Sequence, residues 1–287
     1  MKPTLSVALA TYNEEKNLPQ CLESVKKIAE EILIVDGSST DKTVEIAKSF
    51  GATVFVTDNP PIFHINKQKA LEMAHGEWIL QLDADERVSD ALASEIVKLM
   101  TMTKDEIDEY EKKLPHKNLF YRHQALLEQR DGEIGSNIGA YTAFFIPRLN
   151  FFLGKYLRYG GVYPDGVIRL VKRGKAYFPR KDVHEQMVIT GRVGWLGNPL
   201  FHKDSPTFAR YIERNNRYTD LMAKELQNEK LPKTIWNMLD YMVYKPILWF
   251  ALTFFRHKGF LDGWQGLLFS FFSARRFAIA YIKYLKL

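Results

Sequence analysis

Two acidic residues, Asp83 and Asp85, directly follow an apolar run at residues 78–82. The run predicts a buried strand. Because side chains alternate along a strand, we expect both carboxylates on one face at its carboxyl end. Neighbouring carboxylates repel each other and lose hydration, which costs stability unless a cation binds between them. Hard divalent ions prefer such oxygen ligands, so the spacing indicates a site for a divalent metal ion.

A second acidic strand end supports this hypothesis. Residues 31–35 form another apolar strand pattern, which is followed by Asp36 and the turn residues 37–39. In open α/β sheets, ligands bind at the carboxyl ends of the strands. Two acidic strand ends in one such sheet suggest that a metal and a second ligand are held together.

The first hundred residues alternate between strand and helix patterns. This alternation predicts an α/β fold with right-handed crossovers and a mostly parallel sheet. The expected strands are residues 5–10, 32–35, 53–56 and 78–82, and the expected helices are about 18–28, 41–50, 66–74 and 91–100. No G-x-G-x-x-G motif follows the first strand and no Walker A motif is present, so nicotinamide and P-loop sites lose their main support.

Composition limits the other classes of function. The chain has 287 residues, of which 46% are hydrophobic, so it can bury a full core. Its net charge of +6 is too modest to imply nucleic acid as a partner. The single cysteine, Cys21, excludes an internal disulfide and clustered-cysteine metal sites, and fits a reducing compartment. No apolar signal region precedes the first strand, so we expect most of the protein in the cytoplasm.

Two middle segments differ from this pattern. Residues 103–135 are rich in charge and indicate helices in an exposed insertion without chemistry of its own. Residues 140–195 show short strand patterns at 141–146, 167–171 and 188–189. We expect this part to cover the mouth of the site and to meet the second substrate.

The C-terminal region, residues 234–287, is apolar, aromatic and basic. Its apolar run at 247–255 is too short to span a bilayer, which needs about 20 residues. Helices with an aromatic, apolar face and a basic remainder bind anionic membrane surfaces. We therefore expect peripheral membrane helices here, with a pair of core helices packed on the catalytic domain as the alternative.

Three motifs follow strands in an order that a known family uses. They are Thr-Tyr-Asn-Glu-Glu at 11–15, Val-Asp-Gly-Ser-Ser-Thr-Asp at 35–41 and Leu-Asp-Ala-Asp-Glu at 82–86. Together they resemble inverting glycosyltransferases of family 2, which have the GT-A fold, a Rossmann-like fold of nucleotide-diphospho-sugar transferases. Further segments are similar to the bacterial subgroup that includes lipopolysaccharide-core β-glucosyltransferases: 150–155, 161–165, 168–170, 183–185 and 259–266. The resemblance covers nearly the whole chain, and residues 103–135 are its main departure.

The resemblance implies a site for a nucleotide-sugar donor. It places Thr11, Tyr12, Asn13 and Glu14 at the nucleotide and Asp36 on the base. A carboxylate only accepts hydrogen bonds, so Asp36 can pair with a ring N–H of the kind that uracil offers, which favours a UDP-sugar. A turn or helix-cap role is the alternative for Asp36, and a first-turn helix charge is the alternative for Glu14.

The resemblance also implies Mg²⁺ or Mn²⁺ at the Asp-Ala-Asp (DXD) motif. Asp85 is the expected direct ligand, and Asp83 is expected on the ribose or the metal. His202 is similar to a later histidine found near the diphosphate or metal in such enzymes, and Lys67 is a candidate for contact with the phosphates. A structural histidine and a solvated helix lysine are the alternatives. The ion would stabilise the departing nucleoside diphosphate.

Inversion by a single displacement needs one base, on the face of the sugar opposite the diphosphate. The candidates are Glu185, in the Val-His-Glu segment at 183–185, and Asp165, in a turn. Glu185 is the first choice, because it follows the last strands, where the family places its catalytic acid. Family members more commonly have Glu-Asp at this point. His184 could orient Glu185 or bind an acceptor phosphate.

These inferences predict an inverting, metal-dependent hexosyltransferase that uses a UDP-sugar. We expect a membrane-associated glycan or lipid-linked acceptor, such as lipopolysaccharide core or a similar cell-surface polysaccharide, at the inner face of the plasma membrane. The predicted catalytic domain is 1–233, with a donor half at about 1–102, the insertion and an acceptor half at about 136–233. Helices at 234–287 complete the chain. The alternatives are a polyprenyl-phosphate sugar synthase and a non-catalytic membrane-binding scaffold.

Overall fold

The computed structural model describes residues 3–179 and 186–287, and the chain divides into two compact units. The first unit is Met1–Arg148 with Pro164–His202, and the second is Leu149–Tyr163 with Lys203–Leu287. The division that we expect at residue 233 falls inside the second unit.

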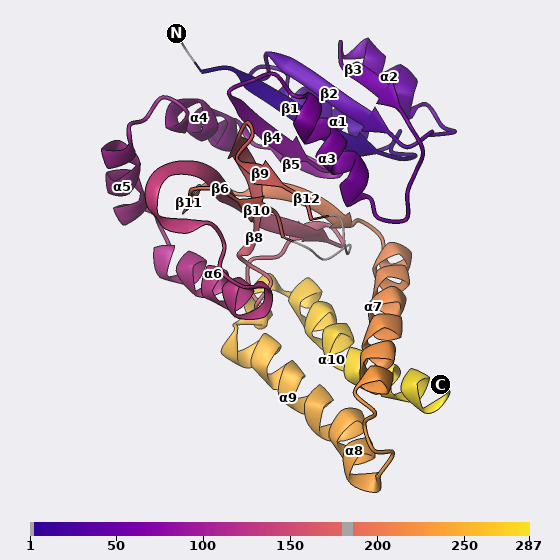
Figure 1. The fold of residues 1–287 in the computed structure, drawn as a ribbon. Coiled ribbons are helices and arrows are strands. Elements are labelled where there is room, and N and C mark those ends of the chain that lie inside the picture. The colour runs from indigo at the N-terminus through magenta and orange to yellow at the C-terminus, as the bar shows by residue number, and fades with distance from the viewer. Residues whose placement is uncertain (1–2, 180–185) are drawn as a thin grey trace. The chain divides into compact units, whose positions relative to one another are not determined.

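The first unit begins with alternating strands and helices, as the sequence predicts (Figure 1). Their bounds are β1 (Leu5–Thr11), α1 (Leu18–Val25), β2 (Glu31–Asp36), α2 (Thr43–Ser49), β3 (Thr53–Val56), α3 (His64–Met73), β4 (Trp78–Leu82), β5 (Glu86–Val88) and α4 (Asp90–Leu99). β1 pairs in parallel with β2 and β4, and β2 pairs in parallel with β3. Parallel pairing brings the carboxyl ends of β1, β2 and β4 to one edge of the sheet.

Apolar burial holds this sheet in place. Every residue of β4 is buried, as expected for a strand that is covered on both faces. α1 buries Leu18, Cys21, Leu22 and Val25, which recur at the spacing of one helix face. Because β4 is fixed along its whole length, the acidic motif that follows it starts from a rigid position.

Later strands extend the sheet with antiparallel pairs and with one parallel pair. They are β6 (Ser136–Phe152), β8 (Asp165–Lys172), β11 (Arg192–Trp195) and β12 (Leu200–Ser205), and the strand order is β3-β2-β1-β4-β8-β6-β12-β5. β8 pairs antiparallel with both β4 and β6, and β12 pairs antiparallel with β5. β9 (Ala176–Tyr177) and β10 (Val188–Ile189) form a separate small sheet. The result is the mixed α/β architecture that the sequence predicts.

The charged segment 103–135 is more than a solvated insertion. It forms α5 (Lys104–Lys112) and α6 (Lys117–Asp131). Glu111 accepts a hydrogen bond from the amide of Trp195 at 2.8 Å, and Phe120 stacks on the Trp195 ring with centroids 4.8 Å apart. Phe120 and Trp195 are almost fully buried. Most residues of this segment are exposed, and one aromatic residue and one acid in its charged sequence attach both helices to the sheet.

The second unit is mainly helical. It contains β7 (Lys155–Tyr156), α7 (Phe208–Asn228), α8 (Ile235–Leu239), α9 (Lys245–Ala251) and α10 (Trp264–Leu285). π-helical turns at Asp240–Tyr244 and Leu252–Arg256 connect and extend α8 and α9, and a 3₁₀ turn at Gly259–Asp262 precedes α10. Tyr281 and Tyr284 of α10 pack with Ala223 and Leu226 of α7. α10 is therefore part of the core of this unit.

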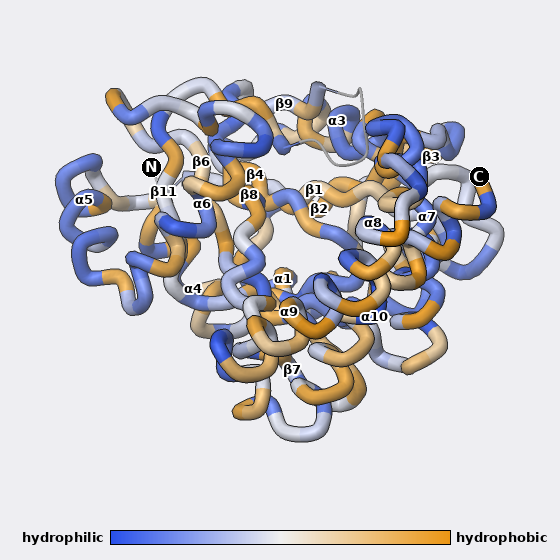
Figure 2. The backbone as a smooth tube through the Cα atoms, turned by 90° about the horizontal axis from the view of Figure 1, so that it is seen from below, coloured by the Kyte–Doolittle hydropathy of each residue, from blue (hydrophilic) through white to orange (hydrophobic). Residues whose placement is uncertain are grey.

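Many apolar side chains of α8, α9 and α10 nevertheless remain exposed. Trp236 is 77% exposed, Phe255 61% and Trp264 57%. Figure 2 shows long hydrophobic stretches along α9 and α10. Among the described residues, none of the helices has both the length and the hydropathy to cross a bilayer.

Candidate active site

The acidic motif lies in the turn between β4 and β5. The amide of Glu86 donates to the carbonyl of Asp83 at 2.9 Å, so Asp83 and Asp85 lie in a turn. The expectation that strand alternation sets both on one face is therefore wrong. The Asp83 carboxylate lies 2.5 Å from Lys67 Nζ and 2.5 Å from Arg169 Nη2. Asp83 is thus the anionic centre of a small cluster with two cations.

The opposite charges in this cluster stabilise the ionised forms of Asp83 and Lys67. Burial would raise the pKa of the Asp83 carboxyl, but the charges of Arg169 and Lys67 outweigh it and hold that pKa well below its usual range. Burial lowers the pKa of the Lys67 ammonium, and the charge of Asp83 acts against this shift. Lys67 is therefore a buried member of the site and not the solvated helix lysine that the alternative hypothesis describes.

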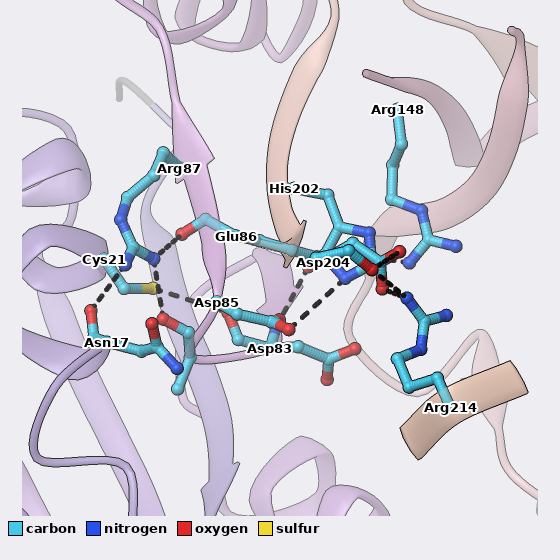
Figure 3. A network of polar contacts seen from close by, with 12 residues as sticks. Asn17, Cys21, Asp83, Asp85, Glu86, Arg87, Arg148, His202, Asp204 and Arg214 are labelled. Carbon is cyan, nitrogen blue, oxygen red and sulfur yellow. Dashed lines mark hydrogen bonds and ion pairs between the residues drawn. The ribbon is translucent and has the colours of Figure 1, made fainter. Parts of the chain in front are cut away.

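Asp85 has a different partner, His202 (Figure 3). Asp85 Oδ2 lies 3.3 Å from His202 Nε2. β12 brings the histidine there, because its antiparallel pairing with β5 sets His202 opposite Glu86. Burial would raise the pKa of the Asp85 carboxyl, but the hydrogen bond and charge of His202 outweigh it and lower that pKa. Two residues far apart in the sequence thus form one pair.

Glu86 is a site residue that the sequence analysis missed. It is fully buried, and its carboxylate lies 2.7 Å from Arg169 Nη2 and 3.3 Å from Arg148 Nη1. It also accepts a hydrogen bond from the amide of Asp83 at 3.0 Å. A glutamate buried this deeply needs such partners. The Asp-Ala-Asp-Glu sequence was the signal that could have pointed to Glu86, but the arginines that pair with Glu86 come from strands distant in the sequence.

Arg87 fixes the shape of the turn (Figure 3). Its guanidinium donates to the carbonyls of Ala84 at 2.6 Å, Glu86 at 2.8 Å and Asn17 at 2.8 Å. The Cys21 thiol lies 3.6 Å from the carbonyl of Asp83. These contacts tie the motif to α1 and to the residue that precedes it, so its backbone is held from two sides.

Asp36 lies at the neighbouring strand end and is fully buried. It accepts hydrogen bonds from the Thr11 hydroxyl at 2.8 Å, the Ser39 hydroxyl at 2.7 Å and the Ser39 amide at 2.8 Å. A carboxylate has about four acceptor positions, so these contacts leave room for one more donor. Asp36 thus has the turn-forming role that the alternative describes, and these contacts use three of its roughly four acceptor positions.

The two loops beside Asp36 are tied together. Asn13 adopts a left-handed φ of 54°, and its side-chain oxygen accepts from the amide of Thr40 at 2.8 Å. The amide of Glu14 donates to the Thr43 hydroxyl at 2.7 Å. Tyr12 is exposed. The loops therefore expose the Tyr12 ring on a backbone that cross-loop bonds hold in place.

The two base candidates have different outcomes. Asp165 lies at the start of β8, where its Oδ2 is 2.7 Å from Arg148 Nη2. The next amide, that of Gly166, donates to His123 Nε2 at 3.1 Å. Glu185, like His184, lies outside the described residues, and so its assignment remains a prediction.

The described side chains at this strand end offer only a partial set of ligands for a divalent ion. Within residues 3–179 and 186–287, no group of three or more His, Cys, Asp or Glu side chains converges as a metal cage. Asp85 Oδ2 and His202 Nε2 lie 3.3 Å apart, so both could contribute to holding one ion. Both carboxylate oxygens of Asp83 already face cations. Asp85 and His202 would hold an ion of the Mg²⁺ or Mn²⁺ type, which would supply positive charge at this strand end.

Two curated bacterial proteins are similar over almost the whole chain. An uncharacterized glycosyltransferase of Rickettsia typhi is 26% identical and covers 99% of this chain and 88% of its own length. A lipopolysaccharide core biosynthesis glycosyltransferase of Rhizobium meliloti, LpsC, is also 26% identical and covers 96% of this chain and 92% of its own length.

Among solved structures, the mannosyltransferase PcManGT from Pyrobaculum calidifontis, in complex with GDP-Man and Mn²⁺, matches with a TM-score of 0.50. It is 13% identical and covers 99% of this chain and 88% of its own, which speaks for a shared GT-A fold. The model of the family "Glycosyl transferase family 2" matches residues 6–163, which include all three motifs at the carboxyl ends of β1, β2 and β4. The chain therefore belongs to glycosyltransferase family 2 and is a glycosyltransferase.

Proposed function

We propose that this enzyme is an inverting, metal-dependent hexosyltransferase that uses a UDP-sugar. The single observation that carries the proposal is the Asp85–His202 pair beside an Asp83 carboxylate that binds two cations. A nucleoside diphosphate leaving group needs positive charge, and these residues would supply or hold it at the carboxyl edge of the sheet.

Asp36 and its neighbours would bind the nucleotide. Its buried carboxylate has room for one further hydrogen bond, which fits a uracil ring N–H. The exposed ring of Tyr12 would stack on the base, and Thr11 would orient Asp36 through its hydroxyl. Asn13 and Glu14 would hold this loop in position through their bonds to the neighbouring loop.

Asp85 and His202 would hold Mg²⁺ or Mn²⁺, with Asp83 on the ribose or the metal. When bound, the ion offsets the negative charge that grows on the leaving diphosphate. Lys67 and Arg169 keep Asp83 ionised, and Glu86 in turn fixes Arg169. Lys67 would also meet the phosphates when the donor binds. Glu185 is proposed as the base that removes the acceptor proton, with Asp165 as the alternative.

The acceptor is proposed to be a membrane-associated glycan or a lipid-linked molecule at the inner face of the plasma membrane. The relative in Rhizobium meliloti is named for lipopolysaccharide core biosynthesis, which supports an acceptor of that type. The exposed aromatic side chains of α8–α10, together with the basic residues of this region, support peripheral binding to an anionic membrane surface.

Calorimetric binding of a panel of nucleotide sugars, with and without Mn²⁺, tests the proposed function. We expect a UDP-sugar to bind and Mn²⁺ to strengthen binding by tenfold or more. Asp85→Ala should remove this effect of Mn²⁺ and lower turnover at least 100-fold, whereas Asp105→Ala, on the exposed face of α5, should change neither. Full activity of Asp85→Ala in EDTA would contradict the metal assignment, and failure to bind any nucleotide would favour the scaffold.

A further inference from the structure

The second unit contains a cavity of about 210 Å³ that the donor site does not involve. It lies among the end of β6, the start of α7 and the middle of α10, and all of its lining residues belong to this unit. Pockets for drug-sized ligands have volumes of roughly 300–1,000 Å³, so this cavity suits one chemical group and the first atoms attached to it.

One wall of the cavity is aromatic. The rings of Phe152 and Tyr211 meet edge to face with centroids 4.8 Å apart, and Phe269 lies 6.0 Å from Phe152. Phe152 and Tyr211 are buried and form part of a small apolar cluster of this unit. This wall is largely apolar, so it favours a hydrocarbon part of a ligand.

Two arginines, Arg214 and Arg276, also line the cavity and supply positive charge. Arg214 is already paired, because its guanidinium contacts the Asp204 carboxylate and donates to the Ser205 hydroxyl at 3.3 Å. Arg276 Nε donates to the carbonyl of Ser273 at 3.2 Å. Among the described residues, no carboxylate pairs with Arg276.

The lining of the cavity therefore carries an excess of positive charge. Its ionised side chains are two arginines and one aspartate, and the aspartate, Asp204, forms an ion pair with Arg214. Burial lowers the pKa of the Arg276 guanidinium, and the groups that act against this shift are the phenols of Tyr211 and Tyr218. A partly buried cation without an anionic partner is costly, and an anionic ligand would remove that cost.

We propose that this cavity binds a phosphate group attached to an apolar chain, with the phosphate on Arg276 and the first carbons of the chain on the Phe152–Tyr211 wall. A guanidinium has five N–H donors, of which Nε is used here, so it can bind a phosphate through two parallel hydrogen bonds. The phenol of Tyr218 and the amide of Asn215 also line the cavity and supply further donors. A phospholipid headgroup and the phosphate of a lipid-linked glycan share this chemistry.

Calorimetry with the full chain and four defined probes tests this site. The probes are inorganic phosphate, a hexose phosphate, a soluble short-chain phosphatidic acid and vesicles of long-chain phosphatidic acid in phosphatidylcholine. We expect the short-chain amphiphile to bind at least tenfold more tightly than inorganic phosphate or the hexose phosphate. Binding of the vesicles as well assigns the source to a bilayer lipid, whereas binding of the soluble amphiphile alone assigns it to a single extracted or lipid-linked molecule.

The matched variants are Arg276→Gln and Arg275→Gln, which make the same charge change at adjacent positions of α10. Arg275 is exposed and does not line the cavity. Arg276→Gln should weaken binding of the short-chain amphiphile at least tenfold, Arg275→Gln less than twofold, and Arg276→Lys should retain part of the affinity. Thermal unfolding of each variant separates loss of binding from loss of the fold. Equal losses in Arg276→Gln and Arg275→Gln, or no binding of the amphiphile by the folded wild-type protein, would overturn the proposal.

Discussion

At the scale of single residues, the base that receives the acceptor proton is the least constrained part of the proposed mechanism. A base in this position contributes about 10²–10⁴-fold to the rate. If Glu185 is this base, replacing its carboxylate by an amide removes the proton acceptor and changes none of the described donor-site residues. Glu185→Gln should therefore bind the nucleotide sugar as the wild type does and lose at least 100-fold in turnover, measured by release of the nucleoside diphosphate.

The comparison variant for the base is Asp165→Asn. Asp165 Oδ2 lies 2.7 Å from Arg148, whose guanidinium also contacts Glu86. A role as base would therefore require Asp165 to act through a carboxylate that Arg148 already binds. Turnover at the wild-type rate in Glu185→Gln, with a loss in Asp165→Asn, would transfer the role to Asp165.

The same residues show what the sequence could and could not predict about the site. Asp36, Asp83 and Asp85 were found because each follows a strongly apolar strand, and strand ends meet at one edge of a parallel sheet. Glu86 was missed, since its partners Arg148 and Arg169 come from strands that pair only in the folded chain. Local patterns reveal anions at strand ends, whereas the cations that balance them are set by tertiary structure.

At the scale of elements, α6 is attached to the sheet beside Asp165. His123 Nε2 accepts the amide proton of Gly166 at 3.1 Å, and the ring meets Trp195 edge to face. Burial lowers the pKa of the His123 imidazole from its ordinary value of 6.5, and the charge of Asp165 acts against this shift. The folded state therefore holds His123 as a neutral acceptor.

This contact predicts a pH dependence of stability. Above about pH 6.5 the imidazole is neutral in both states, so the stability that it supports is fully present. As the pH falls towards the folded-state pKa, the unfolded chain takes up a proton that the folded state does not. The free energy of unfolding then falls by at most about 1.4 kcal/mol per pH unit for this group. Denaturant unfolding between pH 8 and pH 5 measures the slope.

The variants for this test are His123→Asn and His116→Asn. His123→Asn should flatten the slope below pH 6.5 relative to the wild type. His116 is exposed at the start of the same helix, and asparagine tolerates its left-handed φ of 62°, so His116→Asn should keep the wild-type slope. An unchanged slope in His123→Asn would mean that α6 is not held by a neutral imidazole.

The elements also divide into predictable and unpredictable ones. The bounds of β4 agree with the apolar run 78–82, and β1, β2 and β3 agree to within one residue at each end. β5 and β12 were not expected, because the three residues of β5 leave almost no pattern and the last four of the six residues of β12 are polar. Their pairing also joins residues 86–88 to residues 200–202, far apart in the sequence. β6 runs from Ser136 to Phe152, far beyond the predicted 141–146, since its polar first residues break the alternation on which the prediction depended.

At the scale of the whole molecule, the chain leaves the first unit at residue 149, returns at 164 and leaves again at 203. The composition of the sequence changes at about residue 234, but the boundary of the second unit lies elsewhere because it depends on tertiary contacts. In particular, α7 and α10 share one core. Removing residues 234–287 would expose that core. A test of membrane binding therefore needs point variants in the full chain instead of a truncation.

Substitution of the exposed rings tests whether α8–α10 bind an anionic membrane surface. An aromatic side chain buries about 150–250 Å² when fully covered, and each Å² is worth about 25 cal/mol, so even half-burial of two rings favours binding by several kcal/mol. The double variant Trp236→Ser with Phe255→Ser should lower partitioning onto phosphatidylglycerol vesicles at least tenfold in a sedimentation assay.

The control is Ile138→Ser, which changes an 81% exposed apolar residue of the first unit and should leave partitioning unchanged. Partitioning should also weaken with added salt, because the basic residues contribute through screened charge. Equal partitioning of the double variant and the wild type would show that these rings do not bind the membrane. It would favour the alternative, in which the helices pack as core helices on the catalytic domain.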